Sequence, residues 1–473
     1  MTNSPADPAP QPRRLDRISG IAITLLVLTV ILRDASQSDA LRYAARAMLL
    51  IAVAVVSFRR SPPRLPFLIV GAILSAWIVA TRPDWAAILG HALDSAAFVA
   101  AFFAALGTLR HAAELSASIA RAALYLADRP PGKRYLALLA GGEAFSLLLG
   151  YGAISLLGSL VMSSTADEPN ETIRNIRRRR MLLAVQHGFV SCIAWSPLSF
   201  GMVLCVQLVP GGTWAGALPY ALVTAALFCT VGWTLDTLLK PRTTGLTVVP
   251  PDHGSRARDL KPLILLLVVL ASLLTISHLV IGLTAAQSVM IIVPILSALW
   301  IATGDRQGPG YFGRLPQEAR TFIGTRLPGF RGEIVLLSSA SFLGTAGGLA
   351  IAPLVTNWVD LAALPSVLVL CSAIWVIPVM GYLGAHPLLS VSLLFPLLPA
   401  PEAMGVSPAV MICALTAGWS LSGATSPFTA ATVLIGRFAG VSPLRVGIVW
   451  NGLFTLVSAV MATAWIVLLV KLA

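Results

Sequence analysis

The sequence predicts an all-α polytopic membrane protein with about 11 transmembrane helices and two re-entrant hairpins, arranged as two repeats of inverted topology. The composition, the placement of arginine and a motif that recurs half a chain later support this prediction. Of the 473 residues, 57% are hydrophobic and 11% are charged, whereas about 25% of the residues in a soluble domain are charged. The mean hydropathy is +0.84, and many apolar runs reach the roughly 20 residues that cross a bilayer.

The basic residues lie between the apolar runs and not on a soluble face. The net charge is +13, but the arginines gather in short connections, as the positive-inside rule requires of cytoplasmic loops. We therefore expect the lipid bilayer, and no nucleic acid, as a partner. The five cysteines lie inside apolar runs without paired spacing, so they are expected to be small buried residues and neither disulfides nor a metal site: Cys192, Cys205, Cys229, Cys371 and Cys413.

The first repeat is expected at 18–239. Residues 1–17 are rich in proline and alanine and end in a basic cluster, which predicts a disordered cytoplasmic tail. The apolar run after the tail is expected to be the first helix and not a cleaved signal peptide, because many further spans follow it. An amphipathic stretch at 110–128 is expected at the membrane interface. The expected spans are 15–32, 41–58, 65–80, 86–109, 181–209 and 214–239.

A hairpin interrupts this repeat at 135–162. The stretch is apolar but contains Gly150-Tyr151-Gly152, and it is followed by an arginine-rich segment expected to be a loop that holds Arg174 and 177–180. Because both ends then lie on the cytoplasmic side, the stretch is expected to enter and leave the membrane on one side. Such backbone is tolerated only where protein or a water-filled cavity covers it.

The second repeat, 262–473, follows a basic cytoplasmic linker at 240–261 and has the same order of elements. Its hairpin is expected at 364–398 and opens to the opposite side. We expect a multi-pass protein of the cell inner membrane, with a cytoplasmic N-terminus and a periplasmic C-terminus, because every arginine-rich loop then lies inside. The expected spans are 262–283, 285–303, 333–359, 406–438 and 443–472.

The repeat is visible in one short motif. Trp195-Ser196-Pro197-Leu198-Ser199 recurs 230 residues later as Thr425-Ser426-Pro427-Phe428-Thr429. Gly188 and Gly418 keep the same offset, and the glycines Gly152 and Gly384 mark the two hairpin tips. A single kink would be an ordinary Gly/Pro kink, but two matched kinks with matched hairpins indicate an inverted repeat that works by alternating access.

The motif predicts a helix break at 181–209 and another at 406–438. Serine is a preferred N-cap and proline is favoured at the first helical position, so Ser196-Pro197 and Ser426-Pro427 are expected to begin new half-helices inside the bilayer. The new N-termini carry a partial positive charge that suits an anion. The expected substrate-binding residues are Ser196, Ser199, Thr425, Ser426, Thr429, His386, Tyr151 and Ser155, with helix breaks at Pro197, Pro427, Pro387, Gly152 and Gly384.

Few ionisable residues lie in the apolar segments, and such residues are functional candidates. His386 precedes Pro387 at a hairpin tip, so it is a candidate for substrate or proton handling. Asp236 and Glu333 are expected at the interface, His278 is expected to be structural, and His91 is expected to pair with Asp94, one turn away. The whole set is His91, Asp94, Glu143, His187, Asp236, His278, Glu333 and His386.

Together these features resemble the ion transporter superfamily, which includes divalent anion/sodium symporters and arsenite-type permeases. The resemblance covers nearly the whole chain and implies an elevator motion, in which helices 4 to 6 and 9 to 11 with their hairpins slide against a dimeric scaffold made of the rest. The tips lack the Ser-Asn-Thr signatures of the sodium-coupled dicarboxylate members, so proton coupling is preferred while sodium coupling stays open.

The sequence therefore predicts a secondary active transporter for a small anionic solute, acting as a homodimer and without a cofactor beyond the coupling ion, H⁺ or Na⁺. A cation/proton antiporter of the same architecture is the alternative, since unwound carbonyls can also bind cations. A membrane-embedded enzyme such as a glycan polymerase is disfavoured, because no nucleophile–base pair and no metal-spaced His/Cys cluster is present and the expected outer loops are short.

Overall fold

The computed structural model describes residues 14–36, 38–57, 65–127, 129, 131–240, 257–303, 314–358 and 360–472, and within these ranges every regular element is a helix. Nine of the described helices, counting each broken pair as one, are long and apolar enough to cross a membrane. The other two predicted spans correspond to α2 (Asp39–Ser57) and α3 (Leu65–Thr81), of which α2 carries two arginines and α3 has 17 residues. The predicted fold class of a polytopic, all-α membrane protein is confirmed.

The remaining elements follow in chain order. They are α1 (Arg14–Ser36), α4 (Trp85–Glu114), α5 (Ala117–Ala127), α6 (Pro131–Leu149), α7 (Gly152–Ser164), α8 (Glu171–Trp195), α9 (Phe200–Leu208), α10 (Trp214–Leu238), η1 (Ala257–Leu260), α11 (Lys261–Ile276), η2 (Ser277–Ile281), α12 (Ala285–Thr303), α13 (Arg314–Thr321), η3 (Phe322–Arg326), α14 (Leu327–Gly329), α15 (Arg331–Thr356), η4 (Leu361–Ala363), α16 (Ser366–Tyr382), α17 (Pro387–Leu394), η5 (Phe395–Leu397), η6 (Glu402–Met404), α18 (Pro408–Thr425), α19 (Ala430–Ala439), η7 (Arg445–Trp450) and α20 (Gly452–Leu472).

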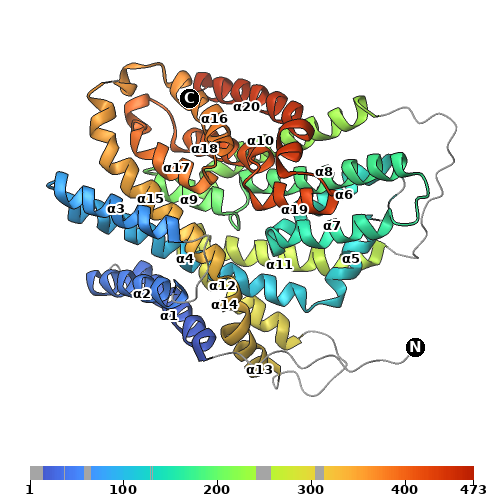
Figure 1. Cartoon of the computed structure of the whole chain (residues 1–473), viewed down its shortest axis with the longest axis horizontal. Helices are drawn as coiled ribbons and strands as arrows, with labels where there is room; N and C mark the ends of the chain where they lie inside the picture. Colours follow the sequence, from blue (N-terminus) through green and yellow to red (C-terminus); the bar gives the residue numbers. More distant parts are fainter. Residues whose placement is uncertain are drawn as a thin grey trace.

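Two units of the same build account for much of the molecule. The first unit, α6 to α10, consists of a helix hairpin, a helix interrupted by a short break and a long returning helix; the second unit, α16 to α20, repeats that order. The helices of the two units lie together in the upper part of Figure 1, while α1, α2 and α13 lie along the opposite edge. Between them, α4 packs against α1, α12 and α15.

Paired glycines bring the hairpins against the broken helices. A side chain at Gly188 of α8 would collide with the carbonyl oxygen of Leu139 on α6. In the second unit, a Cβ at Gly418 of α18 would lie 2.7 Å from the carbonyl oxygen of Ala373 on α16. Small residues let membrane helices approach closely and gain van der Waals contact. The two glycines of the sequence repeat thus have the same packing role in each unit.

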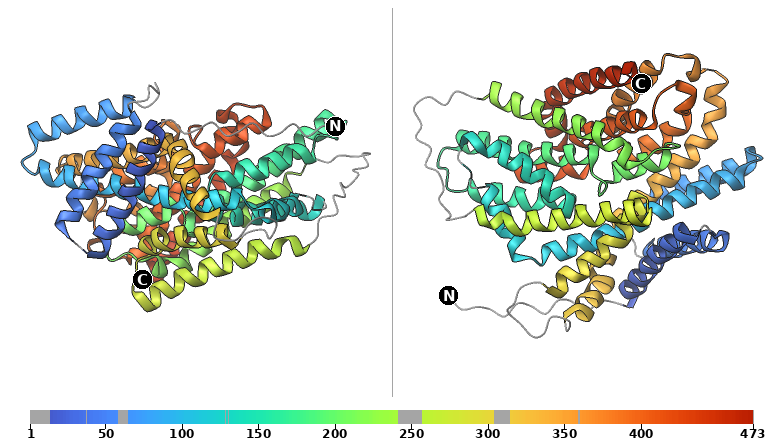
Figure 2. Two further views of the ribbon diagram at one scale, coloured as in Figure 1. Left: turned by 90° about the horizontal axis from the view of Figure 1, so that it is seen from below. Right: turned by 180° about the vertical axis from the view of Figure 1, so that it is seen from behind.

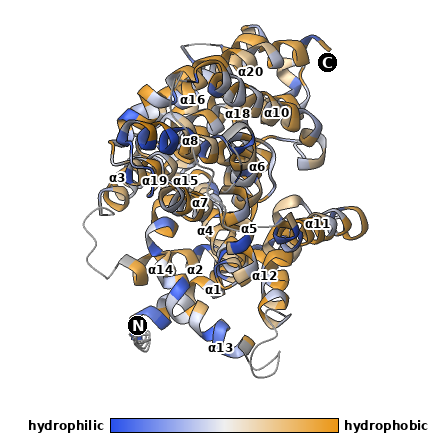
Figure 3. Ribbon diagram, turned by 90° about the vertical axis from the view of Figure 1, so that its right-hand side faces the viewer, coloured by the Kyte–Doolittle hydropathy of each residue, from blue (hydrophilic) through white to orange (hydrophobic). Residues whose placement is uncertain are grey.

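Apolar side chains cover the outer helices. α11 lies along one edge of the molecule (Figure 2), and its exposed residues include Ile264, Leu265 and Val268. The ribbon is mostly hydrophobic on the outer helices, and hydrophilic segments are concentrated in a few places such as part of α8 and α13 (Figure 3). An apolar exterior of this kind is what a lipid-facing surface requires.

The first broken helix begins earlier than predicted. α8 starts at Glu171 and not near 181, because Asn170 caps it by accepting a hydrogen bond from the Ile173 amide at 3.2 Å. Arg174 and 177–180 are therefore helical and not part of a loop. The apolar run marks where the hydrophobic surface begins, whereas the N-cap decides where the helix begins. The stretch expected at the membrane interface, 110–128, is divided over its described residues between the end of α4 and the whole of α5.

The ends of the predicted domains fall partly beyond the described ranges. Residues 14–17 of the expected tail belong to α1, which corrects the tail boundary, and residues 1–13 lie outside the described residues. The same holds for residues 241–256 of the linker 240–261.

Candidate substrate site at two crossed helix breaks

Each broken helix is interrupted by one tight turn. In the first unit α8 ends at Trp195 and α9 begins at Phe200, and in the second unit α18 ends at Thr425 and α19 begins at Ala430. The Ser199 amide donates to the Ser196 carbonyl at 3.1 Å, and the Thr429 amide donates to the Ser426 carbonyl at 3.3 Å. Pro197 and Pro427 are the second residues of these turns, a position where the fixed φ of proline is favoured.

The half-helices begin three residues later than the motif predicts. The expectation that Ser196 and Ser426 cap them, with proline at the first helical position, is wrong. Ser199 caps α9 by accepting the Met202 amide at 3.2 Å, and Thr429 caps α19 by accepting the Thr432 amide at 3.5 Å. The physical reason is that each Ser-Pro pair opens a turn, and the hydroxyl residue at the end of that turn is the first one placed to cap a helix.

Side-chain hydrogen bonds repeat in detail at the two breaks. The Ser196 hydroxyl accepts the Leu198 amide at 3.1 Å, and the Ser426 hydroxyl accepts the Phe428 amide at 3.3 Å.

The capping hydroxyls also reach back to the preceding helix. Ser199 donates to the Ile193 carbonyl at 2.9 Å, and Thr429 donates to the Gly423 carbonyl at 3.3 Å. The hydroxyls thus hold the breaks together, and the remaining amides of each first turn are the groups directed along the half-helix axis.

The two broken helices cross in opposite directions. Gln186 donates to the Ala424 carbonyl at 3.3 Å. A Cβ at Gly423 would lie 3.4 Å from Val190, and a Cβ at Gly201 would lie 3.2 Å from the ring of Trp419. As residue numbers rise along α8 and α9, those of their neighbours on α18 fall, so the helices are antiparallel at the crossing. This is the arrangement that an inverted repeat produces.

The second hairpin tip lies directly on the second break. The Ser426 hydroxyl donates to the Gly381 carbonyl at 2.8 Å. Gly384 has a φ of 98°, which a residue with a side chain rarely adopts. His386 then caps α17, with Pro387 at its first position, and the His386 Nδ1 accepts the Leu388 amide at 3.2 Å.

The first hairpin tip lies farther back along its broken helix. Gly150, and not Gly152, makes the left-handed turn, with a φ of 54°, and Gly152 is the first residue of α7. The Tyr151 ring lies 4.9 Å from the ring of Phe189 on α8. Ser155 is half-buried on α7 and its amide bonds to the Tyr151 carbonyl. No hydrogen bond between described residues joins these tip residues to His386.

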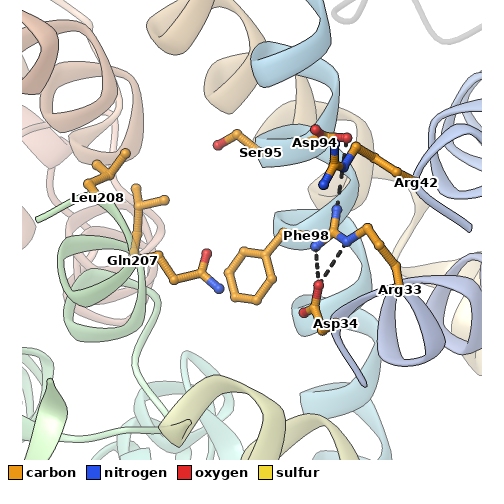
Figure 4. A pocket seen from close by; sticks show the side chains of 9 residues that line it. Arg33, Asp34, Arg42, Asp94, Ser95, Phe98, Gln207 and Leu208 are labelled. Carbon is orange, nitrogen blue, oxygen red and sulfur yellow. Dashed lines mark hydrogen bonds and ion pairs between the residues drawn. The ribbon is translucent and has the colours of Figure 1, made fainter. Parts of the chain in front are cut away.

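A cavity that the sequence did not predict lies beside α9. It measures about 280 Å³ and lies between the α1–α2 corner, α4 and the end of α9 (Figure 4). Its wall carries the ion pairs Arg33–Asp34, at 2.7 Å, and Arg33–Asp94, at 4.0 Å. Asp94 also pairs with Arg46, which does not line the cavity, at 2.6 Å. The expected pairing of His91 with Asp94 is therefore wrong, because Arg46 on α2 reaches the carboxylate with two nitrogens. The lining residues are Arg33, Asp34, Arg42, Asp94, Ser95, Phe98, Leu204, Gln207 and Leu208.

A second cavity of about 130 Å³ lies on another side of the same half-helix, between α9, the start of α10 and the start of α12. Gln207 lines both cavities. Charged residues in or beside apolar runs at 33, 34 and 94 could have indicated the larger cavity, whereas nothing near Gln207 in the sequence marks it.

A series of hydrogen bonds between buried polar side chains connects the two units. The Tyr135 hydroxyl lies 2.6 Å from His187 Nδ1, and His187 Nε2 lies 2.9 Å from Asn451 Oδ1. Asn451 Nδ2 donates to Gln186 Oε1 at 3.1 Å, and Gln186 reaches the second broken helix as described above. Because Asn451 presents its oxygen to His187, the Nε2 atom carries the proton and Nδ1 accepts from Tyr135. Neither Asn451 nor Gln186 was predicted from the sequence to take part in such a chain.

Comparison with solved structures shows which fold the chain has. No protein-family model matches the chain, and no curated protein sequence matches it. Among solved structures, the YdaH transporter of Alcanivorax borkumensis superposes with a TM-score of 0.52 at 16% identity, covering 85% of this chain and 96% of YdaH. The chain has the fold of a membrane transporter. MtrF of Neisseria gonorrhoeae, described with antimetabolite efflux pumps, is similar with a TM-score of 0.49 at 15% identity, over 95% of each chain.

Within this fold, the crossing offers hydroxyls, amides and two half-helix N-termini. Among the described residues, no group of three or more His, Cys, Asp or Glu side chains could hold a metal ion. The chemistry that this arrangement permits is reversible binding of a small polar or charged solute.

Proposed function

We propose that the protein is a secondary active transporter that moves a small anionic solute across the inner membrane by alternating access. The observation that carries the proposal is the antiparallel crossing of two helix breaks with the same hydrogen-bond pattern. Both α9 and α19 begin next to the crossing, so an anion bound there would face two partly positive N-termini. The likeness of the fold to a known transporter supports the same class.

The proposed motion is of the elevator type. The mobile part would comprise α4, α15 and the two units, and the scaffold would comprise α1 to α3, α11 and α12, through which two copies form a dimer. The contacts that cross this boundary include the ion pair between Arg46 of α2 and Asp94 of α4, and the hydrogen bond from Thr108 of α4 to Ser297 of α12 at 3.3 Å. Both would have to break and re-form as the mobile part slides.

The proposed orientation places the N-terminus in the cytoplasm and the C-terminus in the periplasm, which puts the arginine-rich connections inside. The coupling ion is H⁺ or Na⁺. The two helix breaks would form the walls of the substrate site, and the two hairpin tips would close it from either side. The residues of the breaks are Ser196, Ser199, Thr425, Ser426 and Thr429, and those of the tips are Tyr151, Ser155 and His386.

Uptake by proteoliposomes tests the proposal. The purified protein is reconstituted, and accumulation of radiolabelled succinate, glutamate, benzoate, phosphate and sulfate is measured with an imposed proton gradient, an imposed sodium gradient or neither. We expect at least one anion to accumulate above protein-free liposomes, and only with a gradient. Exchange of sodium for protons without uptake of any anion would instead identify a cation/proton antiporter. Absence of all solute and ion flux from a folded protein would reject the transporter assignment.

A further inference from the structure

Glu143 is a partly buried carboxylate next to the first helix break. It lies in the middle of α6, where Gly188 lets α8 approach so closely that a Cβ there would be 2.8 Å from the Glu143 amide nitrogen. Its Oε1 accepts the Trp195 indole N–H at 2.7 Å and lies 3.4 Å from the Ser191 hydroxyl, whose proton the Ala225 carbonyl also faces at 3.2 Å. No Lys, Arg or His in the described part of the chain forms an ion pair with it.

An ionised carboxylate in this place lacks the compensation that buried charges need. Desolvation of a charge is repaid only by a counter-charge and well-made hydrogen bonds, and intramembrane carboxylates without a cation are typical of proton pathways. We propose that Glu143 is the site at which this protein binds its coupling proton. This inference rests on the proposed transport function and names the ion that drives it.

The surroundings of the carboxylate suit a proton better than a metal cation. Hard cations are held by several oxygen ligands, whereas Oε1 of Glu143 already faces two hydrogen-bond donors. The other titratable groups that face it are the thiols of Cys192 on α8 and Cys229 on α10. His187 lies one turn from Ser191 on α8, with both ring nitrogens bonded to Tyr135 and Asn451.

Trp195 connects the proton site to the break. It is the last residue of α8, its indole donates to Glu143, and its carbonyl accepts the Trp214 indole of α10 at 2.9 Å. A hydrogen bond to an ionised acceptor is about twice as strong as one between neutral groups. Binding of a proton to Glu143 therefore weakens the bond that holds Trp195, and the residue at which the helix breaks gains freedom.

Only the first unit carries this site. Gly418 packs on Ala373 as Gly188 packs on Leu139, so Ile377 stands where Glu143 is, and Thr425 stands where Trp195 is at the offset of the broken helices. The two units therefore have matching breaks, but within the residues that the structure describes only the first unit has a carboxylate at this position.

Infrared difference spectroscopy across a pH titration tests the inference without any substrate. The wild-type protein is expected to show a carboxylic-acid C=O band that appears as the pH falls and is missing in Glu143→Gln. The band should remain in Glu333→Gln, a matched control on α15 whose side chain is exposed. In Trp195→Phe the band should shift, because the indole donor is gone while the carboxyl remains.

Uptake measurements complete the test. If any anion accumulates in the wild-type protein, Glu143→Gln is expected to lose the dependence of uptake on the proton gradient, while Glu333→Gln keeps it. A wild-type spectrum with no band that depends on Glu143 would overturn the inference and leave the transport function standing. An unchanged proton dependence in Glu143→Gln would overturn it equally, whereas failure of all uptake with a titrating Glu143 band would count against the transport function alone.

Discussion

Gln186 on α8 donates a hydrogen bond through its Nε2 to the carbonyl oxygen of Ala424 on α18, over 3.3 Å. That carbonyl belongs to the last turn before the second break, where helix carbonyls lack partners within the helix. The Oε1 of the same side chain accepts from Asn451. One buried amide therefore connects the first broken helix to the second and to the start of α20.

Replacement of Gln186 by leucine should destabilise the protein by about 1–3 kcal/mol, because a carbonyl and an amide are left without this buried partner. The measurement is thermal or denaturant unfolding in detergent. Gln207→Leu is the matched control, since Gln207 is exposed beside a cavity and should change stability little. Equal effects of the two substitutions would contradict the role given to Gln186.

The N-caps of the half-helices are expected to affect both stability and transport. Ser199→Ala and Thr429→Val should each cost about 1 kcal/mol of stability. Both should also reduce uptake, because the caps fix the first turns of the proposed substrate site. Thr213→Ala removes the cap of α10, whose hydroxyl accepts the Gly216 amide at 3.1 Å. This control should lose comparable stability and keep its uptake. If uptake fell equally in all three variants, the breaks would have no special role.

The close approach of η7 to the second break predicts a contrast between two glycines. A Cβ at Gly447 would collide with the carbonyl oxygen of Thr425, whereas a Cβ at Gly452 would meet nothing within 4 Å. Gly447→Ala should therefore destabilise the protein by about 1–3 kcal/mol. Gly452→Ala should be neutral or slightly stabilising, since alanine is the better helix former. Unfolding of both variants in detergent checks this, and similar unfolding curves would argue against the packing described.

The ion pair of Arg46 with Asp94 should show measurable coupling. Both side chains are mostly buried, with 20% and 23% of their surface exposed. The burial of this ion pair is therefore intermediate between that of an exposed pair and that of a fully buried one. A double-mutant cycle with Arg46→Gln and Asp94→Asn should give about 1–2 kcal/mol. Additive effects of the two substitutions would show that the pair contributes nothing to the contact between α2 and α4.

Much of the fold could be predicted because its signals are local. Apolar runs revealed the spans, and the repeated Ser-Pro motif revealed both breaks at their correct positions. The N-caps were predicted three residues too early, because a Ser-Pro pair is typical both of a helix N-terminus and of a turn. The start of α8 was placed too late because charged residues continue the helix beyond its apolar part.

The contacts of the candidate site were harder to predict because they join distant parts of the chain. Asn451 and Gln207 are ordinary residues within apolar segments, and nothing near them in sequence indicates His187 or a cavity as a neighbour. The partner of Asp94 was missed for the same reason: Arg46 lies on another helix, whereas His91 lies one turn away. Glu143 was visible as an ionisable residue, but its relation to Trp195 depends on the packing of α6 on α8.

Cross-linking combined with uptake tests the central claim most directly. In a variant whose five cysteines are replaced by serine, one cysteine pair joins the two broken helices (Val190→Cys with Gly423→Cys), and a second joins α4 to α12 (Thr108→Cys with Ser297→Cys). Both pairs are expected to form disulfides. Uptake should survive the first, which lies within the proposed mobile part, and should stop with the second, which ties that part to the scaffold. Failure of the first pair to cross-link, or full uptake with the second pair closed, would contradict the account.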